Sequence, residues 1–480
     1  MTAESPQGHA ETVRLWSLTE DTLIEAGDDG SLVAITWWGE YEFPGAADGV
    51  RESLGRLALG PVSMANLAVP GQAAGSDQWR LSLRKILTRL SGSVVHSLAL
   101  NDGRGPVLSA IPVTQFPVFP DRPLPPGRQV RLSRFTALRA DEGALLAESP
   151  GARYKVALFR PPAIAIASAL ASPATVEQLA ETTGVPVPVV ADVVEFLVAA
   201  GVVLLGDAEG RFIEHGDPDT AIWSHDDLMF HARSRTWQKG PPPDPGVGRT
   251  GAEPPVVKPV TAGPTFPLPR PDPLALPDRD PTLTALLETD LACPDFSERP
   301  LSARQIGEFL FRTARVRSVG PAHLPGGPAH EASQRPYFSV ACLYELEIYV
   351  GINRCTDLAP GIYHYDPLWH TLTLINDDAA VLDNLLDMAM IAAGSHRRPS
   401  ALLTMTARMA RIAWVLGGAA YATTLLHLGA LQQVFSLAAR AMGLAAHAVP
   451  VDSGDRVDRA LKLEWPAEVS VGECVLDFPE

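Results

Sequence analysis

The clearest hydrophobic pattern of the chain lies in Ala171–Leu205, where apolar positions recur at helical spacing and end in a continuous apolar run. This spacing predicts two helices separated by a turn at Gly184-Val185-Pro186, followed by a strand. Ser172 or Thr175 can cap the first helix, because a hydroxyl oxygen accepts a hydrogen bond from a free backbone N–H group. A helix, a turn with glycine, a second helix and a strand are typical of a winged helix.

A looser copy of this pattern precedes it in the chain. Short strands are predicted around Trp37-Trp38, a helix from Gly49, and further apolar helical positions over Leu81–Leu90. We therefore expect an N-terminal β/winged-helix-like module over residues 1–120 and a second winged-helix module over residues 121–235.

The second half of the chain mixes strand and helix patterns. Strands and long apolar helices in one segment indicate an α+β domain, which we place at residues 299–480. The predicted elements are a helix over Ser302–Ser318 capped by Ser302, a buried strand at the end of Arg335–Val350, a strand pair over Pro360–Leu374 with a turn at Asp366-Pro367, and helices over Ala379–Ala393 and Tyr421–Met442.

The most apolar stretch, Ile412–Leu426, has about 15 residues, fewer than the roughly 20 that cross a membrane. Gly417-Gly418 interrupts it, so we expect a buried core helix. The N-terminus has neither a basic region nor an apolar run, and no secretory signal is predicted. These patterns predict a soluble, cytoplasmic protein.

Proline makes the division between the two halves visible. The chain has 44 prolines in 480 residues, and 14 of them lie between Pro241 and Pro281. This stretch has neither helical nor alternating periodicity, which favours an extended, semi-rigid connector. We place the linker at residues 236–298.

The charge of the chain excludes several classes of partner. The net charge is −16, and residues 161–210 of the predicted winged helix contain no lysine or arginine. Nucleic-acid affinity comes mainly from cations that neutralise phosphates, so a peptide is favoured over DNA as the ligand of this module. Four cysteines without a C-x-x-C pair exclude a disulfide scaffold and a cysteine-based zinc site, and no metal is predicted.

One basic cluster follows the first helix of the second half. Arg312, Arg315 and Arg317 place three cations near the end of this helix, where they could hold a phosphate by charge-assisted hydrogen bonds. The alternative is a solvated basic face.

Five stretches of the chain resemble the SagB-type (ThcOx-like) azoline dehydrogenases of ribosomal peptide natural product biosynthesis, which have a nitroreductase-like flavoprotein fold. The stretches occur in the family's order. They are WSHDDLMFHARSR (Trp223–Arg235), EFLFRTARVR (Glu308–Arg317), RPYFSVACLYELEIYV (Arg335–Val350), APGIYHYDPLWHTL (Ala359–Leu372) and SVGECVL (Ser470–Leu476).

The resemblance implies a fold, a cofactor and a reaction. It implies that 121–235 is a leader-peptide-recognition-like module and that 299–480 is a nitroreductase-like FMN-type domain within an α+β protein. Members of the family bind FMN at a homodimer interface and oxidise thiazolines or oxazolines of a precursor peptide to thiazoles or oxazoles. The expected partners are the precursor peptide, with its leader and azoline core, the cyclodehydratase of the same pathway, and a second dehydrogenase subunit.

The resemblance also implies roles for particular residues. Arg312, Arg315 and Arg317 would hold the FMN phosphate, and Ser339 and Tyr344 would lie near the isoalloxazine ring. The helix with Gln432 and Gln433 would pack under the flavin or across the dimer, with Gln433 as the expected cofactor contact.

The sequence departs from the family at positions near the flavin. Where the family has Pro-Ser-Gly-Gly, this chain has Phe338-Ser339-Val340-Ala341, and Val415-Leu416 replaces the Lys-Tyr pair proposed to transfer protons. Tyr421 and His427 are the nearest ionisable candidates for a replacement. The alternatives are a packed aromatic for Tyr421 and a satisfied core or interface histidine for His427.

Two hypotheses for the function follow. In the first, the chain is an FMN-dependent dehydrogenase with another proton acceptor. In the second, it is a catalytically degenerate, peptide-clamping subunit of a heterodimer, in which FMN is shared with or bound mainly by the partner. A winged-helix transcription factor is disfavoured by the acidic module.

Overall fold

The computed structural model describes residues 12–26, 31–45, 48–67, 77–215, 222–234, 252–259, 262–288, 295–323, 329–450 and 455–479. The chain divides into an N-terminal unit, Met1–Pro242, and a C-terminal unit, Pro243–Glu480, which are considered separately.

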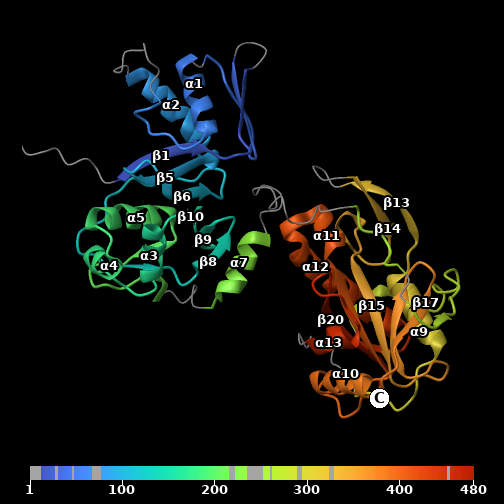
Figure 1. Cartoon of the computed structure of the whole chain (residues 1–480). Helices are drawn as coiled ribbons and strands as arrows, with labels where there is room; N and C mark the ends of the chain where they lie inside the picture. The colour runs from blue at the N-terminus through green and yellow to red at the C-terminus, as the bar shows by residue number, and fades with distance from the viewer. Residues whose placement is uncertain are drawn as a thin grey trace, which may run out of the picture. The chain divides into compact units, whose positions relative to one another are not determined.

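The N-terminal unit is built on a six-stranded antiparallel sheet with the order β1-β5-β6-β10-β9-β8 (Figure 1). Its strands are β1 (Thr12–Leu18), β5 (Val94–Leu100), β6 (Pro106–Pro112), β10 (Tyr154–Leu158), β9 (Ala144–Glu148) and β8 (Ala137–Asp141). Strands from both sides of residue 120 therefore share one sheet, so the two predicted modules are joined by backbone hydrogen bonds.

Two small clusters of elements flank this sheet. The first contains the three-stranded sheet β2-β3-β4, in which Trp37-Trp38 forms the turn between β3 and β4. Its apolar core, which includes Leu32, Leu54 and Leu83, is fully buried. The elements are β2 (Leu23–Ala26), β3 (Leu32–Thr36), β4 (Gly39–Phe43), α1 (Asp48–Leu59), α2 (Asp77–Arg89) and the 3-10 turn η1 (Ser91–Ser93).

The second cluster is the helix-turn-helix predicted from the sequence. Thr175 caps α4 with a capping box, in which its side chain and that of Gln178 satisfy each other's backbone N–H groups. Gly184 ends the helix in the left-handed conformation, at φ +68°. The elements are β7 (Val130–Leu132), α3 (Pro161–Ala169), α4 (Val176–Thr183), α5 (Val187–Ala200), β11 (Val203–Leu205), η2 (Ile213–His215) and α7 (His225–Ser234).

The C-terminal unit has a seven-stranded antiparallel sheet with the order β12-β17-β16-β15-β18-β20-β19. Its strands are β12 (Thr265–Pro267), β17 (Thr371–Asn376), β16 (Gly361–Asp366), β15 (Leu346–Ile352), β18 (Ala401–Arg408), β20 (Glu468–Asp477) and β19 (Ala445–Val449). Alternate side chains of β15 enter different apolar clusters, as Ile348 packs with α9 and α12 while Tyr349 packs with α10 and α13. The unit is thus a mixed α+β fold with helices on both faces of the sheet.

The remaining elements of this unit cover or border the sheet. They are α8 (Leu283–Leu287), α9 (Ala303–Ala314), the hairpin β13 (Ser318–His323) and β14 (Ala329–Gln334), η3 (Val340–Cys342), α10 (Ala379–Ala392), α11 (Met409–Leu416), η4 (Gly417–Ala419), α12 (Ala420–Ala441) and α13 (Asp455–Ala460). Ser302 caps α9 as predicted, again with a capping box.

The apolar stretch Ile412–Leu426 differs from the single buried helix that its composition predicts. Gly417 adopts φ +52° and ψ −125°, which breaks the helix between α11 and α12. Tyr421 and Leu426 are exposed, while Leu431 further along α12 is fully buried. Periodicity alone could not place the break, because residues on both sides of it are helical and apolar.

Among the described residues, Met409–Ala441 is long and apolar enough to cross a membrane. Leu428, Leu431 and Phe435 of α12 pack into the main core of the C-terminal unit. These contacts place this part of α12 in the core of the C-terminal unit.

Part of the proline-rich stretch packs on the C-terminal unit. β12 pairs with β17, and Leu268 enters the main core. Pro255 and Val256 accept hydrogen bonds from Arg408 through their carbonyl oxygens. In the part of the predicted linker that the structure describes, residues 252–259 and 262–288 therefore belong to the C-terminal unit. Composition could not show this, since extended chain with few N–H donors occurs both in linkers and on folded surfaces.

Candidate functional site

A strained turn stands at the position where the resemblance places the flavin. Ala341, Cys342 and Tyr344, between β14 and β15, have φ of +52°, +54° and +48°. Residues with a Cβ atom rarely adopt this left-handed conformation, which costs about 1–2 kcal/mol for each residue. The turn therefore persists because its surroundings hold it.

His427 of α12 holds the first part of this turn. Its Nε2 accepts a hydrogen bond from the backbone N–H of Val340 at 2.7 Å. Its Nδ1 lies 2.9 Å from the nearer carboxylate oxygen of Glu345, and both side chains are fully buried. Since Nε2 accepts, the proton is on Nδ1 and is donated to the Glu345 carboxylate.

Further hydrogen bonds hold the rest of the turn. His330 Nε2 lies 2.9 Å from the carbonyl oxygen of Ala341 and donates to it. The hydroxyl of Ser339 accepts from the backbone N–H of Tyr344 at 3.1 Å, and the Tyr344 hydroxyl donates to the carbonyl oxygen of Tyr337 at 2.8 Å. Ser339 and Tyr344, expected near the isoalloxazine ring, thus lie in the turn, and their polar groups are engaged within the protein.

The three predicted phosphate-binding arginines differ in their surroundings. Arg312 is largely buried and pairs with Asp280 and with Glu308. Arg315 donates to the carbonyl oxygen of Phe311 at 2.7 Å and lies 4.2 Å from the centre of its ring. Burial and the neighbouring Arg317 cation lower the pKa of Arg315.

Arg317 is exposed at the start of the β13–β14 hairpin. Within the described parts of the chain, no carboxylate lies within salt-bridge distance of Arg315 or Arg317. Two adjacent cations without a counterion are a reasonable place for an anion, whereas Arg312 is already neutralised.

The position of the family's Lys-Tyr pair is apolar in structure as well as in sequence. Leu416 is buried and Val415 is partly buried, and both pack with Leu343 and Ile412. Gln433 and Tyr421 are exposed on α12. The structure therefore brings His427 to the strained turn, and it does so as a satisfied buried histidine.

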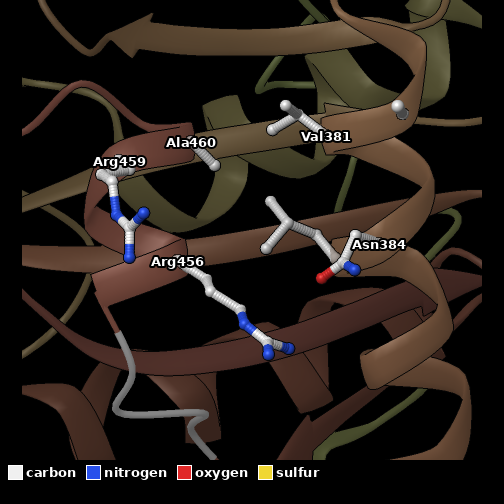
Figure 2. A pocket seen from close by; sticks show the side chains of 7 residues that line it. Val381, Asn384, Arg456, Arg459 and Ala460 are labelled. Carbon is white, nitrogen blue, oxygen red and sulfur yellow. The ribbon is translucent and has the colours of Figure 1, made fainter.

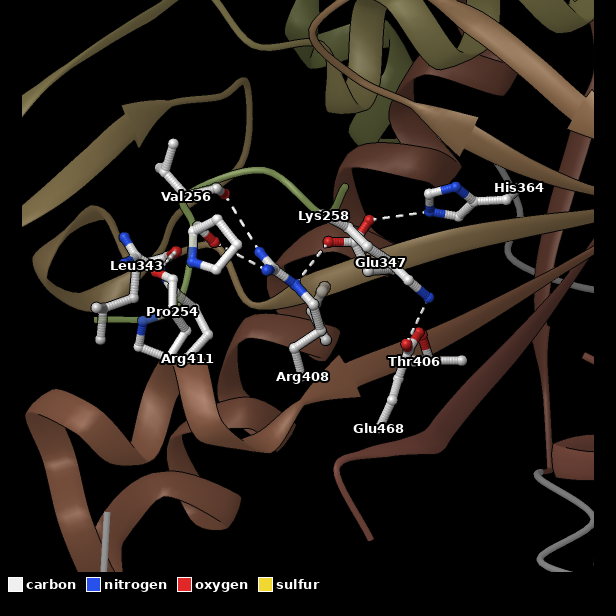
Figure 3. A network of polar contacts seen from close by, with 12 residues as sticks. Pro254, Val256, Lys258, Leu343, Glu347, His364, Thr406, Arg408, Arg411 and Glu468 are labelled. Carbon is white, nitrogen blue, oxygen red and sulfur yellow. Dashed lines mark hydrogen bonds and ion pairs between the residues drawn. The ribbon is translucent and has the colours of Figure 1, made fainter. Parts of the chain in front are cut away.

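A buried polar network adjoins the turn, and sequence reasoning missed it (Figure 3). Glu347 of β15 forms an ion pair with Arg408, whose Nε lies 2.8 Å from a carboxylate oxygen, and lies 3.1 Å from His364 Nε2. Burial raises the pKa of Glu347, but the contacts with His364 and Arg408 outweigh it and lower the pKa to about 2. The only signal was two glutamates, at 345 and 347, in an otherwise apolar strand sequence.

The network also fixes the proline-rich stretch. Glu468 of β20 accepts from Lys258 at 2.5 Å and from Tyr349 at 3.1 Å. The fully buried guanidinium of Arg411 donates to Glu253 at 2.9 Å and to the carbonyl oxygen of Glu331. Glu253 and Lys258 are thereby tied to the helix and strands that surround the turn.

The residues fit a phosphate-bearing flavin in part. Arg315 and Arg317 could hold a phosphate, and the backbone N–H of Arg317 pairs with Gln334, the last residue of β14 before the turn. Arg312, Ser339 and Tyr344 would support such a site only indirectly. No group of histidine, cysteine, aspartate or glutamate side chains that could hold a metal ion is found among the described residues.

Residues 130–239 match the family described as cyanobactin oxidase ThcOx, which confirms the resemblance to SagB-type azoline dehydrogenases. The match covers less than a quarter of the chain and begins at β7. No curated protein matches the chain.

Several solved structures are similar over nearly half of the chain. A protein of Anabaena variabilis assigned as a nitroreductase is 20% identical, with a TM-score of 0.35, over 47% of this chain and 40% of its own. A protein of Ralstonia eutropha with the same assignment is 20% identical, with a TM-score of 0.34, over 47% of this chain and 97% of its own. The Escherichia coli microcin synthetase McbBCD complex with truncated pro-MccB17 contains a chain that is 18% identical, with a TM-score of 0.33, over 42% of this chain and 74% of its own.

Proposed function

Starting from the match of residues 130–239 to the cyanobactin oxidase family, we propose that this chain is a dehydrogenase of azoline rings in a ribosomally made precursor peptide. It oxidises thiazolines or oxazolines to thiazoles or oxazoles. The observation that carries the proposal is the strained turn, in which Ala341, Cys342 and Tyr344 keep the left-handed conformation.

The strain supports retained function for a physical reason. Left-handed residues other than glycine cost free energy and persist where the surrounding structure imposes them, which is common at functional sites. Here Ala341 stands where the family has glycine, and the backbone keeps a shape that glycine would adopt without cost. The buried pair of His427 and Glu345 is arranged to impose that shape.

FMN is the cofactor that the proposal requires. Arg315 and Arg317 would hold its phosphate, and the turn at Val340-Ala341 would border its ring. When bound, FMN supplies the hydride acceptor for the oxidation of the azoline. The chain's own task is to hold the peptide ring in place and to exclude water, because Leu416 and Leu343 make this region apolar.

The test begins with the purified full-length chain. We expect this chain to bind flavin in stoichiometric amount, which its absorbance shows. We also expect an azoline-containing peptide to lose a hydride and a proton, which mass spectrometry detects. A chain that stays colourless after incubation with FMN and leaves the azoline intact contradicts the proposal.

A second candidate is favoured by the apolar residues at 415 and 416. Neither Val415 nor Leu416 can accept a proton, and His427 is already bound on both ring nitrogens. These features suit a degenerate subunit that clamps the peptide and completes a site on a homologous partner. A chain that turns yellow and becomes active only when co-produced with such a homologue supports this candidate.

The N-terminal unit is proposed as the clamp for the leader of the precursor peptide. α4 and α5 carry Glu177, Glu181, Asp192 and Glu195 and no cation, and Arg14 of β1 is already paired with Glu195, which disfavours nucleic acid. Binding of a labelled leader peptide should survive high salt if backbone pairing on a strand edge provides the affinity. The cyclodehydratase of the same pathway and a second dehydrogenase subunit, in a homodimer or heterodimer, are the proposed protein partners, in the cytoplasm.

A further inference from the structure

A cavity lies on the face of the C-terminal sheet that α10 and α13 cover, away from α12. It has a volume of about 360 Å³, and its lining comes from these two helices (Figure 2). The lining residues are Ala380, Val381, Asn384, Leu385, Arg456, Arg459 and Ala460.

The floor of the cavity is apolar and rigid. Leu385 and Ala460 are each only 4% exposed, and both belong to the apolar cluster between the helices and the sheet. Val381 packs against the same cluster. An apolar group of a few carbon atoms can therefore be placed against a fixed surface.

The wall of the cavity carries positive charge. Arg456 and Arg459 are three residues apart on α13, so their side chains lie on one face of the helix. Asn384 adds an amide from α10, and the N-terminal end of α10 adds the positive end of its dipole.

The carboxylates of α10 and of its cap are engaged elsewhere. Asp378 accepts hydrogen bonds from the backbone N–H groups of Ala380 and Val381 as the cap of α10. Asp383 and Asp387, on the same helix, both bind Arg398. Within the described ranges, no carboxylate lies within salt-bridge distance of Arg456.

We propose that this cavity binds a carboxylate that is attached to a small apolar group. The guanidinium of Arg456 would bind the carboxylate through two parallel hydrogen bonds, with Arg459 and Asn384 beside it. The apolar group would lie on Val381, Leu385 and Ala460. A free leucine-like acid and the C-terminal residue of a peptide share this chemistry, and the site does not depend on the function proposed above.

The test uses the full-length chain and saturation-transfer NMR with N-acetylleucine. We expect N-acetylleucine to bind, its carboxamide to bind about tenfold more weakly because the charge-assisted bonds are lost, and inorganic phosphate not to compete. Equal binding of the acid and the amide, or displacement by phosphate at equal concentration, would overturn the proposal.

Variants locate the binding site. Arg456→Gln should weaken binding of N-acetylleucine about tenfold, while the matched Arg397→Gln, at an exposed arginine paired with Glu298, should leave it unchanged. Val381→Phe, which fills the apolar floor, should abolish binding without unfolding the chain, as checked by circular dichroism. Binding that survives both Arg456→Gln and Val381→Phe contradicts the site.

A short peptide that ends in leucine distinguishes the two sources of the ligand. If the peptide acid competes with N-acetylleucine, the site accepts a peptide C-terminus. If it does not, the site is confined to small free acids. Either result requires binding of N-acetylleucine that depends on Arg456.

Discussion

At the scale of single residues, Ala341 shows how a side chain can be tolerated where its family has glycine. The backbone of Ala341 is held at φ +52° by two hydrogen bonds, one from the N–H of the preceding Val340 to His427 and one from His330 to the carbonyl oxygen of Ala341. The conformation is kept by the surrounding hydrogen bonds, so the strain should be removable without loss of shape.

Ala341→Gly should raise the free energy of unfolding of the C-terminal unit by about 1 kcal/mol, because glycine adopts positive φ without a steric penalty. Urea denaturation measures this change. The same substitution in the middle of α12, Ala430→Gly, is the matched control and should instead lower stability by about 1 kcal/mol, since its backbone is helical. A loss of stability in both variants contradicts the strain.

His427→Ala should destabilise the C-terminal unit by about 3 kcal/mol. It leaves the Glu345 carboxylate buried without a donor and the Val340 N–H without an acceptor. The control is Tyr421→Ala on the exposed side of the same helix, where a change within about 0.5 kcal/mol is expected. Thermal or urea unfolding measures both variants. Equal losses of stability would contradict the proposed role of the His427–Glu345 pair.

His96 predicts a dependence of stability on pH in the N-terminal unit. Burial, and to a lesser degree Arg14, lowers the pKa of His96 to about 4 from its ordinary value of 6.5. Its ring stacks on Phe119, with the ring centres 4.4 Å apart. The neutral ring is favoured in the folded state, so this stabilisation is complete above pH 6.5 and is lost as the pH falls toward 4, by up to about 3 kcal/mol.

Urea denaturation of the N-terminal unit at pH 7 and pH 4.5 measures the effect of His96. His96→Phe keeps the aromatic stacking and removes the titrating group. Between pH 7 and pH 4.5 the variant should therefore lose less unfolding free energy than the wild type, by up to about 3 kcal/mol. The variant is needed because His370, in the C-terminal unit, also has a pKa lowered to about 4, chiefly by burial. Identical pH profiles for the wild type and the variant would rule out the role of His96.

At the scale of elements, the end of α9 separates a structural arginine from the candidates for ligand binding. Arg312→Gln should cost about 2 kcal/mol in unfolding free energy, because Asp280 loses its cation in a partly buried place while Glu308 keeps only Arg279. Arg317→Gln should leave stability within about 0.5 kcal/mol and weaken FMN retention about tenfold. Thermal unfolding measures the stability of the two variants, and flavin fluorescence measures how much FMN they retain. If both variants retain FMN as well as the wild type does, the result argues against a phosphate at this helix end.

Sequence patterns predicted the elements that carry their own local signals. The helices around Gly184 and the start of α9 at Ser302 were predictable because caps and left-handed glycines are encoded within a few residues. The Gly417-Gly418 pair marked the interruption of the apolar stretch, whereas the pairing of β12 with β17 was not predictable, since it depends on packing between segments far apart in the chain.

The candidate site, too, could be predicted from the sequence only in part. Ser339 and Tyr344 were expected near the isoalloxazine ring, and His427 was a candidate proton acceptor. The structure brings all three to one turn. That the turn is strained, and that Arg312 is neutralised by Asp280, could not be predicted, because backbone conformation and long-range ion pairs leave no periodic signal.

At the scale of the whole molecule, each unit has its own apolar core. Leu197 lies in the core of the N-terminal unit and Leu431 in that of the C-terminal unit, and both are fully buried. Cores that share no residues are expected to unfold as separate cooperative units.

Scanning calorimetry should therefore resolve two transitions. Leu197→Ala should lower the transition temperature of the N-terminal unit and Leu431→Ala that of the C-terminal unit. Each loss should correspond to about 2–5 kcal/mol, and the other transition should not move. One transition that both variants shift together would show that the units unfold as one.

The buried charges around Glu347, Arg408 and Lys258 have a consequence for the working temperature of the C-terminal unit (Figure 3). Removing charged groups from water carries a penalty that shrinks on heating, because the ordering of water around ions becomes less favourable as temperature rises. Ion pairs of this kind therefore oppose folding most in the cold and least near the melting temperature. These ion pairs should consequently contribute more to the stability of the C-terminal unit near its melting temperature than near 0 °C.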